Sequence, residues 1–161
     1  MEMKKAEKQY IRRANPQDYG RIGEIYVFNN RAEYFPVFEN VPFSFGELQV
    51  LSYVKELQET KADIFVYDDG VIKGFVLMKE KEIDKLHIEP FFQGQGIGKL
   101  LLDHAITVCG ADHLWVLEKN SRAVAFYQSR GLEKTKEKAP LYGPLGQTEW
   151  MVKMTVKDKV L

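Results

Sequence analysis

Hydrophobic and polar residues follow two different periods along this chain, and the two periods alternate. Short segments with apolar side chains at every second position, or in a brief continuous run, predict β-strands, and segments with apolar side chains three and four residues apart predict helices. The expected strands cover residues 10–13, 63–67, 71–78, 82–88, 114–117, 132–137 and 148–156, and the expected helices begin at Asn15, Ser44, Ile97 and Ser121. The predicted order of elements is therefore β-α-α-β-β-β-α-β-α-β-β.

A segment rich in aromatic residues and prolines, residues 31–45, separates the first two expected helices. It contains Tyr34-Phe35-Pro36-Val37-Phe38 and then Val41-Pro42-Phe43. Because proline is disfavoured inside a helix, we expect an irregular connection here. Its rings either pin the connection to the core or form one wall of a binding site, and the sequence favours the two interpretations equally.

Length and charge fit an ordinary globular protein. The chain has 161 residues, of which 45% are hydrophobic and 29% are charged, and we expect one domain over residues 1–161. Lys+Arg and Asp+Glu both number 23, so no bulk charge favours nucleic acid or an anionic membrane as a partner. No apolar run is long enough to span a bilayer, and the charged segment 1–9 lacks the apolar region of a secretory signal.

Cysteine and histidine usage predicts neither a disulfide nor a metal site. Cys109 is the only cysteine, which excludes an intrachain disulfide and fits a reducing cytoplasm. Its position in the third expected helix favours core packing over a nucleophilic role. His87, His104 and His113 lack the spacing of metal ligands.

The strongest chemical signal is the segment Gln93-Gly94-Gln95-Gly96-Ile97-Gly98-Lys99. It follows an expected strand that ends at Glu89-Pro90, and it opens into the helix that begins at Ile97. A glycine-rich turn between a strand and a helix presents backbone N–H groups and the helix N-terminus to an anion. We therefore expect a phosphate or pyrophosphate site, with a tight turn that binds no ligand as the alternative.

Two common phosphate-binding motifs do not fit this turn. A Walker loop needs Gly-Lys followed by Ser or Thr, whereas Leu100 follows Gly98-Lys99, so no hydroxyl is available for magnesium. The dinucleotide fingerprint needs Gly-x-Gly-x-x-Gly at the start of a βαβ unit. Here the glycines run Gly-x-Gly-x-Gly behind several expected strands.

The glycine turn and a second block, residues 114–132, resemble the GCN5-related N-acetyltransferase (GNAT) superfamily. The first family block is the acetyl-CoA-binding motif Arg/Gln-x-x-Gly-x-Gly/Ala. The second block here has the strand Leu114-Trp115-Val116-Leu117, then Asn120, Ala125-Phe126-Tyr127 and Gly131-Leu132, with Leu132 where the family usually has Phe. The resemblance implies an α/β (α+β) GNAT fold: a mixed, mostly antiparallel central sheet of about seven strands with four helices, whose strands splay at the acetyl-CoA cleft.

The resemblance also implies which residues bind acetyl-CoA. Backbone groups of Leu86, His87 and Ile88 would pair with the pantetheine arm and the acetyl carbonyl. Asn120 would reach the pantetheine arm, Phe126 would pack on the cofactor, and Tyr127 would protonate the departing sulfur. The residues that would cradle the pyrophosphate are Gln93, Gly94, Gln95, Gly96, Ile97, Gly98 and Lys99. Lys99 and Arg122 could meet coenzyme A phosphates or simply be solvated.

A general base is also needed, because an amine is protonated at neutral pH and must lose a proton before it attacks. Glu82 lies where some family members have a catalytic glutamate, and we take it as the first candidate. Strand alternation puts it on the same face as Leu86 and Ile88 if the strand has no bulge. The alternatives are a solvated Glu82 and a water chain that acts as the base.

Other residues are expected around the acceptor. Glu33, Tyr34 and Phe35 are placed on the substrate side, and Glu33 and Tyr34 are lesser candidates for the base. His87 is a further lesser candidate, but it alternates to the opposite strand face, so we expect it to pack rather than react. Glu33, Glu39 and Glu82 could together favour a cationic acceptor.

The resulting hypothesis is a cytoplasmic N-acetyltransferase that moves the acetyl group of acetyl-CoA directly to a primary amine. The acceptor would be a small molecule or a protein amine, with no nucleic acid or membrane partner, and the protein would be a monomer or a homodimer. One alternative is a coenzyme-A-binding sensor or scaffold without catalysis. Another is a nucleotide-binding regulatory domain that uses the same glycine turn.

Overall fold

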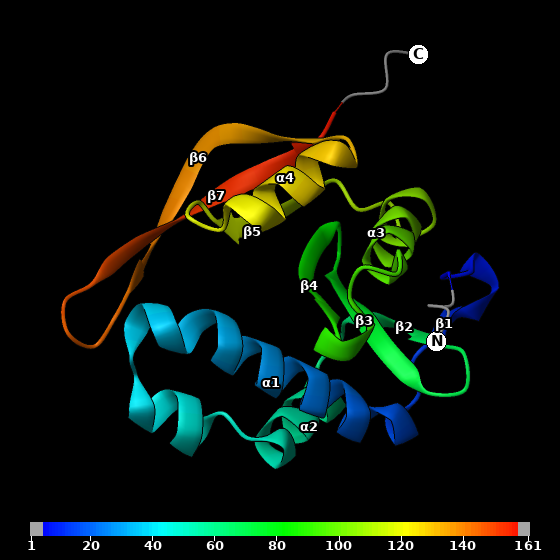
Figure 1. Ribbon diagram of the computed structural model, residues 1–161, viewed down its shortest axis with the longest axis horizontal. Helices are drawn as coiled ribbons and strands as arrows, with labels where there is room; N and C mark the ends of the chain where they lie inside the picture. The colour runs from blue at the N-terminus through cyan, green and yellow to red at the C-terminus, as the bar shows by residue number, and fades with distance from the viewer. Residues whose placement is uncertain (1–4, 158–161) are drawn as a thin grey trace.

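The computed structural model describes residues 5–157, which form one seven-stranded sheet and four α-helices (Figure 1). The sheet order is β1-β2-β3-β4-β5-β7-β6. The strands are β1 (Ile11–Arg13), β2 (Asp63–Asp68), β3 (Ile72–Lys79), β4 (Glu82–Ile88), β5 (His113–Leu117), β6 (Leu132–Tyr142) and β7 (Thr148–Val156). The helices are α1 (Tyr19–Phe38), α2 (Val50–Glu59), α3 (Ile97–Thr107) and α4 (Ser121–Ser129). Residues 1–4, which begin the charged N-terminal segment, and 158–161 lie outside the described residues.

One pair of strands differs from the rest of the sheet. β4 and β5 are parallel, whereas the other neighbouring strands are antiparallel. Their ladder contains just two residue pairs, Glu82 with His113 and Ile83 with Leu114. Beyond Ile83 the two strands diverge, which leaves one backbone edge of β4 without a strand partner (Figure 1). The predicted mixed, mostly antiparallel sheet with splayed strands is confirmed.

Each face of the sheet has its own hydrophobic core. Under α3 and α4, the core joins both halves of the sheet, for example through Ile83 of β4, Leu101 of α3 and Met154 of β7. Under α1 and α2, the core contains side chains of β2 and β3, such as Phe75, and none of β5, β6 or β7 among the described residues. The space between α1 and the second half of the sheet is therefore not filled by core. Across residues 5–157, no helix combines the length and apolar character that crossing a membrane requires.

Helix α1 is longer than the sequence predicts. It continues through Pro36 to Phe38, so the irregular connection expected over residues 31–45 is wrong for its first half. Pro36 lies in the last helical turn, so the hydrogen bond that its missing N–H removes and the strain from its ring affect only the end of the helix. Glu39, with a φ of 48°, ends the helix in the left-handed conformation.

The connection after α1 also differs from the prediction. Ser44 does not cap a helix but is buried inside a π-helical turn, Pro42–Glu47, and α2 begins later with Gln49 as its N-cap residue. Arg31 stabilises this turn, because its guanidinium donates to the carbonyl oxygens of Ser44 (2.8 Å) and Leu48 (3.0 Å). A long-range contact of this kind overrides the local capping pattern.

A bulge in β4 changes which side chains share a face. The β3–β4 register pairs Leu77 with Lys85 and Met78 with Ile83, so Asp84 has no partner in the ladder. As a result Ile83, rather than Glu82, points to the same core as Leu86 and Ile88. The expectation that Glu82 shares a face with Leu86 and Ile88 is therefore wrong, because it required a regular strand.

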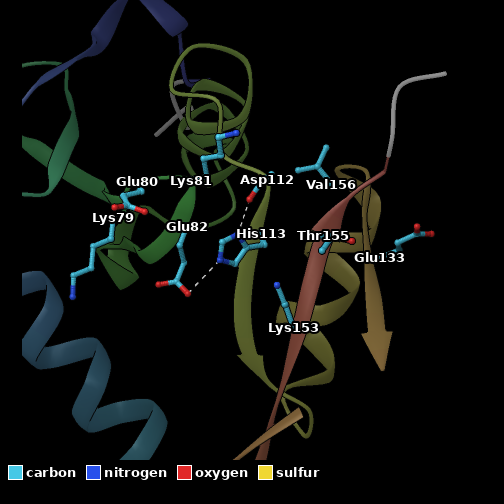
Figure 2. A pocket seen from close by; sticks show the side chains of 10 residues that line it. All are labelled: Lys79, Glu80, Lys81, Glu82, Asp112, His113, Glu133, Lys153, Thr155 and Val156. Atoms are coloured by element: carbon cyan, nitrogen blue, oxygen red, sulfur yellow. Dashed lines mark hydrogen bonds and ion pairs between the residues drawn. The ribbon is translucent and has the colours of Figure 1, made fainter. Parts of the chain in front are cut away.

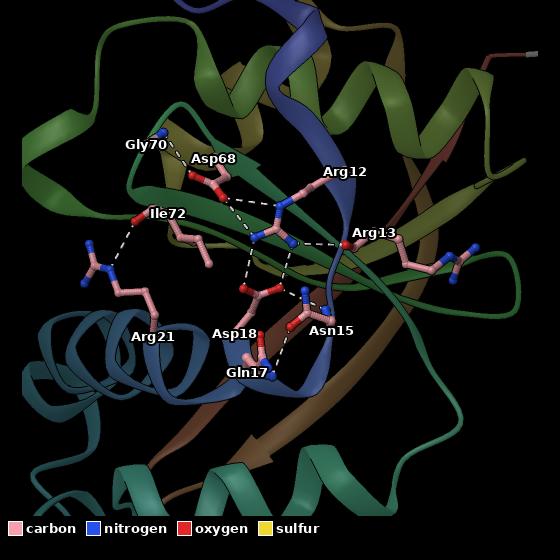
Figure 3. A network of polar contacts seen from close by, with 9 residues as sticks. All are labelled: Arg12, Arg13, Asn15, Gln17, Asp18, Arg21, Asp68, Gly70 and Ile72. Atoms are coloured by element: carbon pink, nitrogen blue, oxygen red, sulfur yellow. Dashed lines mark hydrogen bonds and ion pairs between the residues drawn. The ribbon is translucent and has the colours of Figure 1, made fainter.

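A charged network joins β1, β2 and the start of α1 (Figure 3). The Arg12 guanidinium donates to both oxygens of the Asp18 carboxylate (2.7 and 3.0 Å) and to Asp68 Oδ2 (2.9 Å). Asp18 also accepts the backbone N–H of Asn15 at 2.8 Å, and Asn15 Oδ1 accepts the N–H of Gln17, which confirms the predicted N-cap. These hydrogen bonds lower the pKa of the Asp18 carboxyl, and the hydrogen bond from Arg12 has the largest effect.

We expect Asp18→Asn to lower the free energy of unfolding by about 1–3 kcal/mol at pH 7, the usual worth of hydrogen bonds to a charged group. The native pKa of Asp18 is below its usual 3.8, so its charge stabilises the fold above that pH, and this contribution is lost as pH falls through the native pKa. Urea unfolding should therefore show that the wild type has a higher free energy of unfolding than Asp18→Asn at pH 7, and that this difference is smaller at pH 3. Asp63→Asn, which removes an exposed ion pair with Arg13, is the control and should change little at either pH. An equal loss from both substitutions would contradict this interpretation.

Candidate active site

A cleft of about 520 Å³ lies where β4 separates from the second half of the sheet. It is bounded by the end of β4, the glycine turn, the first turn of α3, the start of α4 and one face of α1. The predicted cofactor residues that line it are Leu86, His87, Ile88, Gln93, Gly94, Gly96, Ile97, Gly98, Lys99, Asn120, Phe126 and Tyr127. The structure thus brings together residues that lie as much as 41 positions apart in the sequence.

The β4 side of the cleft is a backbone edge. The short β4–β5 ladder leaves this edge free beside Leu86, His87 and Ile88. Extended backbone with free N–H and C=O groups can pair with an amide-containing chain, as a neighbouring strand would. The carbonyl of Ile88 already accepts hydrogen bonds from Asn29 Nδ2 (2.9 Å) and Gln93 Nε2 (3.3 Å). His87 pairs with Phe75 of β3, so a ligand on this edge would meet the backbone of Leu86 with fewer competing partners.

The glycine turn forms one end of the cleft. Gly94 (φ 80°) and Gly96 (φ 89°) adopt the left-handed conformation, and Gly96 is the N-cap residue of α3. The unpaired N–H groups of the first helical turn and the helix dipole favour a bound anion there. Lys99 and Arg122 also line this cleft and add positive charge. Gln95 does not line it, and its carbonyl oxygen accepts the N–H of Ala6 at 3.1 Å.

Helix α4 contributes the second wall. Asn120 is its N-cap residue, and because Asn120 Oδ1 accepts the N–H of Ala123 (3.1 Å), its amide NH₂ is the group left to donate to a ligand. The Phe126 and Tyr127 rings lie 5.4 Å apart. Burial, and then the charges of Glu33 and Tyr34, raise the pKa of Tyr127 to about 12. Tyr127 is therefore a protonated hydroxyl at neutral pH.

The residues predicted on the substrate side separate in the structure. Glu33 lines the cleft. Tyr34 stacks on Phe38 with ring centroids 6.3 Å apart, and burial, followed by the charge of Glu33, raises its pKa to about 12. Phe35 packs against Phe45 at 5.0 Å in the connection after α1. Of the three residues, Glu33 alone lines the cleft, and the Tyr34 and Phe35 rings pack against other rings of the same segment.

Glu82 lines a different pocket, of about 900 Å³, at the start of β4 and β5 (Figure 2). Its carboxylate lies 3.6 Å from His113 Nε2, and His113 Nδ1 lies 2.5 Å from Asp112 Oδ1. Side chains from β3, β4, β5, β6 and β7 complete this pocket, among them Lys153. Glu82 does not line the cleft that holds Tyr127, so its predicted role as the base has no direct support from this placement.

His87 packs in the way the sequence predicts. Its ring contacts the rings of Tyr26 (5.5 Å between centroids) and Phe75 (5.7 Å). Burial, and then the charge of Lys85, lower the pKa of His87 to about 4, so the imidazole is neutral at pH 7. Its Nδ1 lies 3.5 Å from Asn29 Nδ2.

The structure adds two residues that the sequence did not single out. Asn29 is buried in α1 and contacts both Ile88 and His87. A polar residue on the core face of a predicted helix could have marked it in the sequence, because buried polar groups need hydrogen-bond partners. Gly74 in β3 lets β4 approach, because a Cβ there would lie 2.6 Å from Ile88 Cδ1 and 3.0 Å from the His87 carbonyl oxygen. No sequence pattern marks Gly74, since its neighbours come from other elements.

Neither metal nor cysteine chemistry is indicated in the described part of the chain. Residues 5–157 contain no cluster of three or more His, Cys, Asp or Glu side chains that could hold a metal ion. Cys109 does not line the cleft, and burial raises the pKa of its thiol. A raised thiol pKa is the opposite of what a nucleophilic cysteine requires.

Comparison with known proteins gives a family and a set of relatives. The sequence model of the acetyltransferase (GNAT) family matches residues 26–132. Peptidyl-lysine N-acetyltransferase YjaB of Salmonella typhimurium is 36% identical over 92 residues, which cover 52% of this chain and 63% of YjaB. YjaB of Escherichia coli is 36% identical over 62 residues, 38% of this chain and 42% of that protein. The chain thus matches less than two thirds of the length of both relatives.

Solved structures show the same fold over nearly the whole chain. A GCN5-related N-acetyltransferase from Rhodopseudomonas palustris has a TM-score of 0.70 at 21% identity and covers 97% of this chain and 98% of its own. YncA of Salmonella typhimurium, solved with acetyl-CoA, has a TM-score of 0.66 at 18% identity and covers 94% of both chains. The family match, together with this agreement in fold, shows that the chain belongs to the acetyltransferase (GNAT) family.

Proposed function

We propose that this protein, acting as a single domain, is an acetyl-CoA-dependent N-acetyltransferase that acts on a primary amine. The observation that carries the proposal is one cleft in which the free edge of β4, the glycine turn at the start of α3, and the protonated hydroxyl of Tyr127 come together. The free edge suits an amide-containing arm, and the glycine turn suits a pyrophosphate. YncA was solved with acetyl-CoA, and YjaB is named a peptidyl-lysine N-acetyltransferase. Both names support a thioester donor and an amine acceptor.

In the proposed reaction, a neutral amine attacks the thioester carbonyl carbon, and a C–N bond forms. The oxygen of the tetrahedral intermediate becomes negative, and backbone N–H groups on the free β4 edge are suited to stabilise it. The C–S bond then breaks. Tyr127 gives its hydroxyl proton to the departing sulfur and regains the proton that the nitrogen loses as the amide forms. Because a tyrosine is a weaker acid than a thiol, this return of a proton keeps the transfer from being uphill.

Direct attack needs no acyl-enzyme intermediate. Cys109 lies outside the cleft with a raised pKa, and therefore does not serve as a nucleophile in this proposal. The acceptor class is an amine of a protein or of a small molecule, since YjaB is named for peptidyl-lysine and a solved Vibrio cholerae relative is named a spermidine/spermine N-acetyltransferase. A cytoplasmic location, with a monomer or homodimer as the assembly, is part of the proposal because a lone cysteine fits a reducing compartment.

Ligand-induced stabilisation tests the cofactor first. Acetyl-CoA and coenzyme A should raise Tm, whereas ATP and NAD should not. A ligand at a hundred times its Kd adds about 2.7 kcal/mol to folding stability, which is a shift of several degrees for a protein of this size. If neither acetyl-CoA nor coenzyme A raises Tm, the cleft is not a coenzyme A site, and a shift with ATP or NAD alone would favour the nucleotide-binding alternative.

Amine acetylation tests the reaction itself. We expect thiol release from acetyl-CoA with at least one amine in a panel of putrescine, spermidine, lysine, a peptide with an internal lysine and a peptide with a free N-terminus. Thiol detection measures turnover, and mass spectrometry locates the added acetyl group. Coenzyme A binding without turnover across a wider amine panel would instead favour the sensor or scaffold alternative.

A further inference from the structure

Helix α1 changes character along its length. Its first turns bury Ile22 and Ile25 in the core under the sheet. The following positions on that face, spaced as i, i+3, i+4 and i+7, are Tyr26, Asn29, Asn30 and Glu33. A helix that simply packs on a sheet keeps an apolar stripe. Of these four residues, Asn29 and Glu33 line the cleft, whereas Tyr26 packs against the core and Asn30 is buried, so α1 passes from the core to the cleft along this face.

Glu33 is the end of this polar stripe and the carboxylate that lines the cleft. Among the cleft-lining residues in the described chain it is the single acidic side chain. Solvent reaches it, yet enough protein surrounds it that burial raises its pKa. No hydrogen bond or ion pair to another described residue occupies its oxygens. It is therefore free to bind a cation that enters the cleft.

Glu33 interacts electrostatically with the tyrosine assigned as the acid. Its charge contributes to the raised pKa of Tyr127 on α4 and of Tyr34 on α1. Glu33 on α1 and Tyr127 on α4 therefore line the same cleft and interact electrostatically across it. By contrast, Glu82 lines another pocket and faces His113.

Other titratable groups around the cleft are poor competitors for this role. His87 on β4 lines the cleft, but its pKa of about 4 and its enclosure by two rings make it a weak and hindered base. The remaining charged or titratable groups that line the cleft or interact electrostatically with Glu33 are Tyr26, Tyr34, Tyr127, Lys99 and Arg122. The three tyrosines are protonated at neutral pH, and the two cations cannot accept a proton.

We infer that Glu33 accepts the proton of the acceptor ammonium, so that the general base of this protein comes from α1 and not from Glu82 of β4. This inference rests on the proposed function. The ammonium R–NH₃⁺ binds at the Glu33 carboxylate and transfers one proton to it, which yields R–NH₂ and a neutral Glu33. The amine attacks the thioester, its second proton passes through Tyr127 to the sulfur, and Glu33 returns its proton to water. The sum is R–NH₃⁺ plus acetyl-CoA giving the amide, coenzyme A and one H⁺.

Glu33→Gln tests the inference, with the amine that gives the fastest turnover in the panel. We expect kcat/KM at pH 7 to fall by about 10²- to 10⁴-fold, the usual contribution of a positioned base. Acetyl-CoA binding, measured by thermal shift, should stay unchanged. The matched control is Glu24→Gln, which removes the same charge from the exposed side of α1 and should keep full activity.

The pH profile separates a base from a structural carboxylate. With Glu33 as the base, wild-type kcat/KM should rise through the Glu33 pKa and then stay level towards pH 8. In Glu33→Gln, the free amine alone should react, so kcat/KM should rise about tenfold per pH unit over the same range. A fluorinated alkylamine, which is largely neutral at pH 7, should lose much less from the substitution than its unfluorinated analogue.

Three results would contradict the inference about Glu33 and leave the proposed function intact. These are an active Glu33→Gln with the wild-type pH profile, an equal loss for both amines, and a Glu82→Gln variant that alone acquires the free-amine profile. Failure of the wild type to acetylate any amine would instead remove the proposed function, and the inference with it.

Discussion

Tyr127→Phe is expected to lower kcat by about 10²-fold or more while the Kd for acetyl-CoA stays within about twofold, because general acid catalysis contributes about 10²- to 10⁴-fold. The substitution removes one hydroxyl and keeps the ring that packs against Phe126 at 5.4 Å. The pKa of Tyr127, raised to about 12, keeps this hydroxyl protonated, so wild-type kcat should not decline between pH 7 and pH 10 through loss of its proton. Steady-state turnover and isothermal titration with acetyl-CoA measure the two quantities separately.

Tyr142→Phe is the matched control, since Tyr142 is 76% exposed at the end of β6 and does not line the cleft. It loses the same hydroxyl and should keep wild-type kcat. If Tyr127→Phe also keeps wild-type kcat, the acid role is wrong and the departing thiolate takes its proton from elsewhere. If acetyl-CoA binds both proteins equally and the wild type has no turnover, the sensor interpretation is correct.

The features that the sequence predicted best are those fixed by neighbouring residues. The glycine turn needs a left-handed backbone at Gly94 and Gly96, and both residues have positive φ angles in the structure. The N-cap Asn15 and the expected strands likewise depend on short spacings, and all of them formed. The family resemblance added the splay between β4 and β5, because the two sequence blocks lie on its two sides.

The features that the sequence did not predict depend on contacts between distant segments. Helix α1 continues past its expected end, and Arg31 organises the following turn through the carbonyls of Ser44 and Leu48. A bulge at Asp84 turns Glu82 away from the face of Leu86 and Ile88. The family position, with regular strand alternation, favoured Glu82 as the base, whereas Glu33, ranked lower from the sequence, is the acidic side chain that lines the cleft.

Gly96→Ala should raise the Kd for acetyl-CoA at least tenfold, which corresponds to about 1.4 kcal/mol of binding free energy. Gly96 lines the cleft with a φ of 89°, and a Cβ there would meet no protein atom closer than Ala6 Cβ at 3.9 Å. The added methyl group therefore does not clash within the protein, but it would occupy space that a bound pyrophosphate needs beside the N–H groups of α3. Because Tyr127 and Glu33 are unchanged, kcat at saturating acetyl-CoA should stay near the wild-type value.

Gly110→Ala isolates this effect from backbone strain. Gly110 follows the same helix at its other end with a φ of 75°, a Cβ added there would have no atom within 4 Å, and the residue does not line the cleft. Both substitutions force an alanine into the left-handed region at a cost of about 1–2 kcal/mol, so the two variants should lose similar stability in urea unfolding. Only Gly96→Ala should then weaken acetyl-CoA binding. Equal losses of affinity in the two variants would mean that acetyl-CoA binding depends on the stability of α3 as a whole. Unchanged affinity in Gly96→Ala would mean that the pyrophosphate does not bind at this turn.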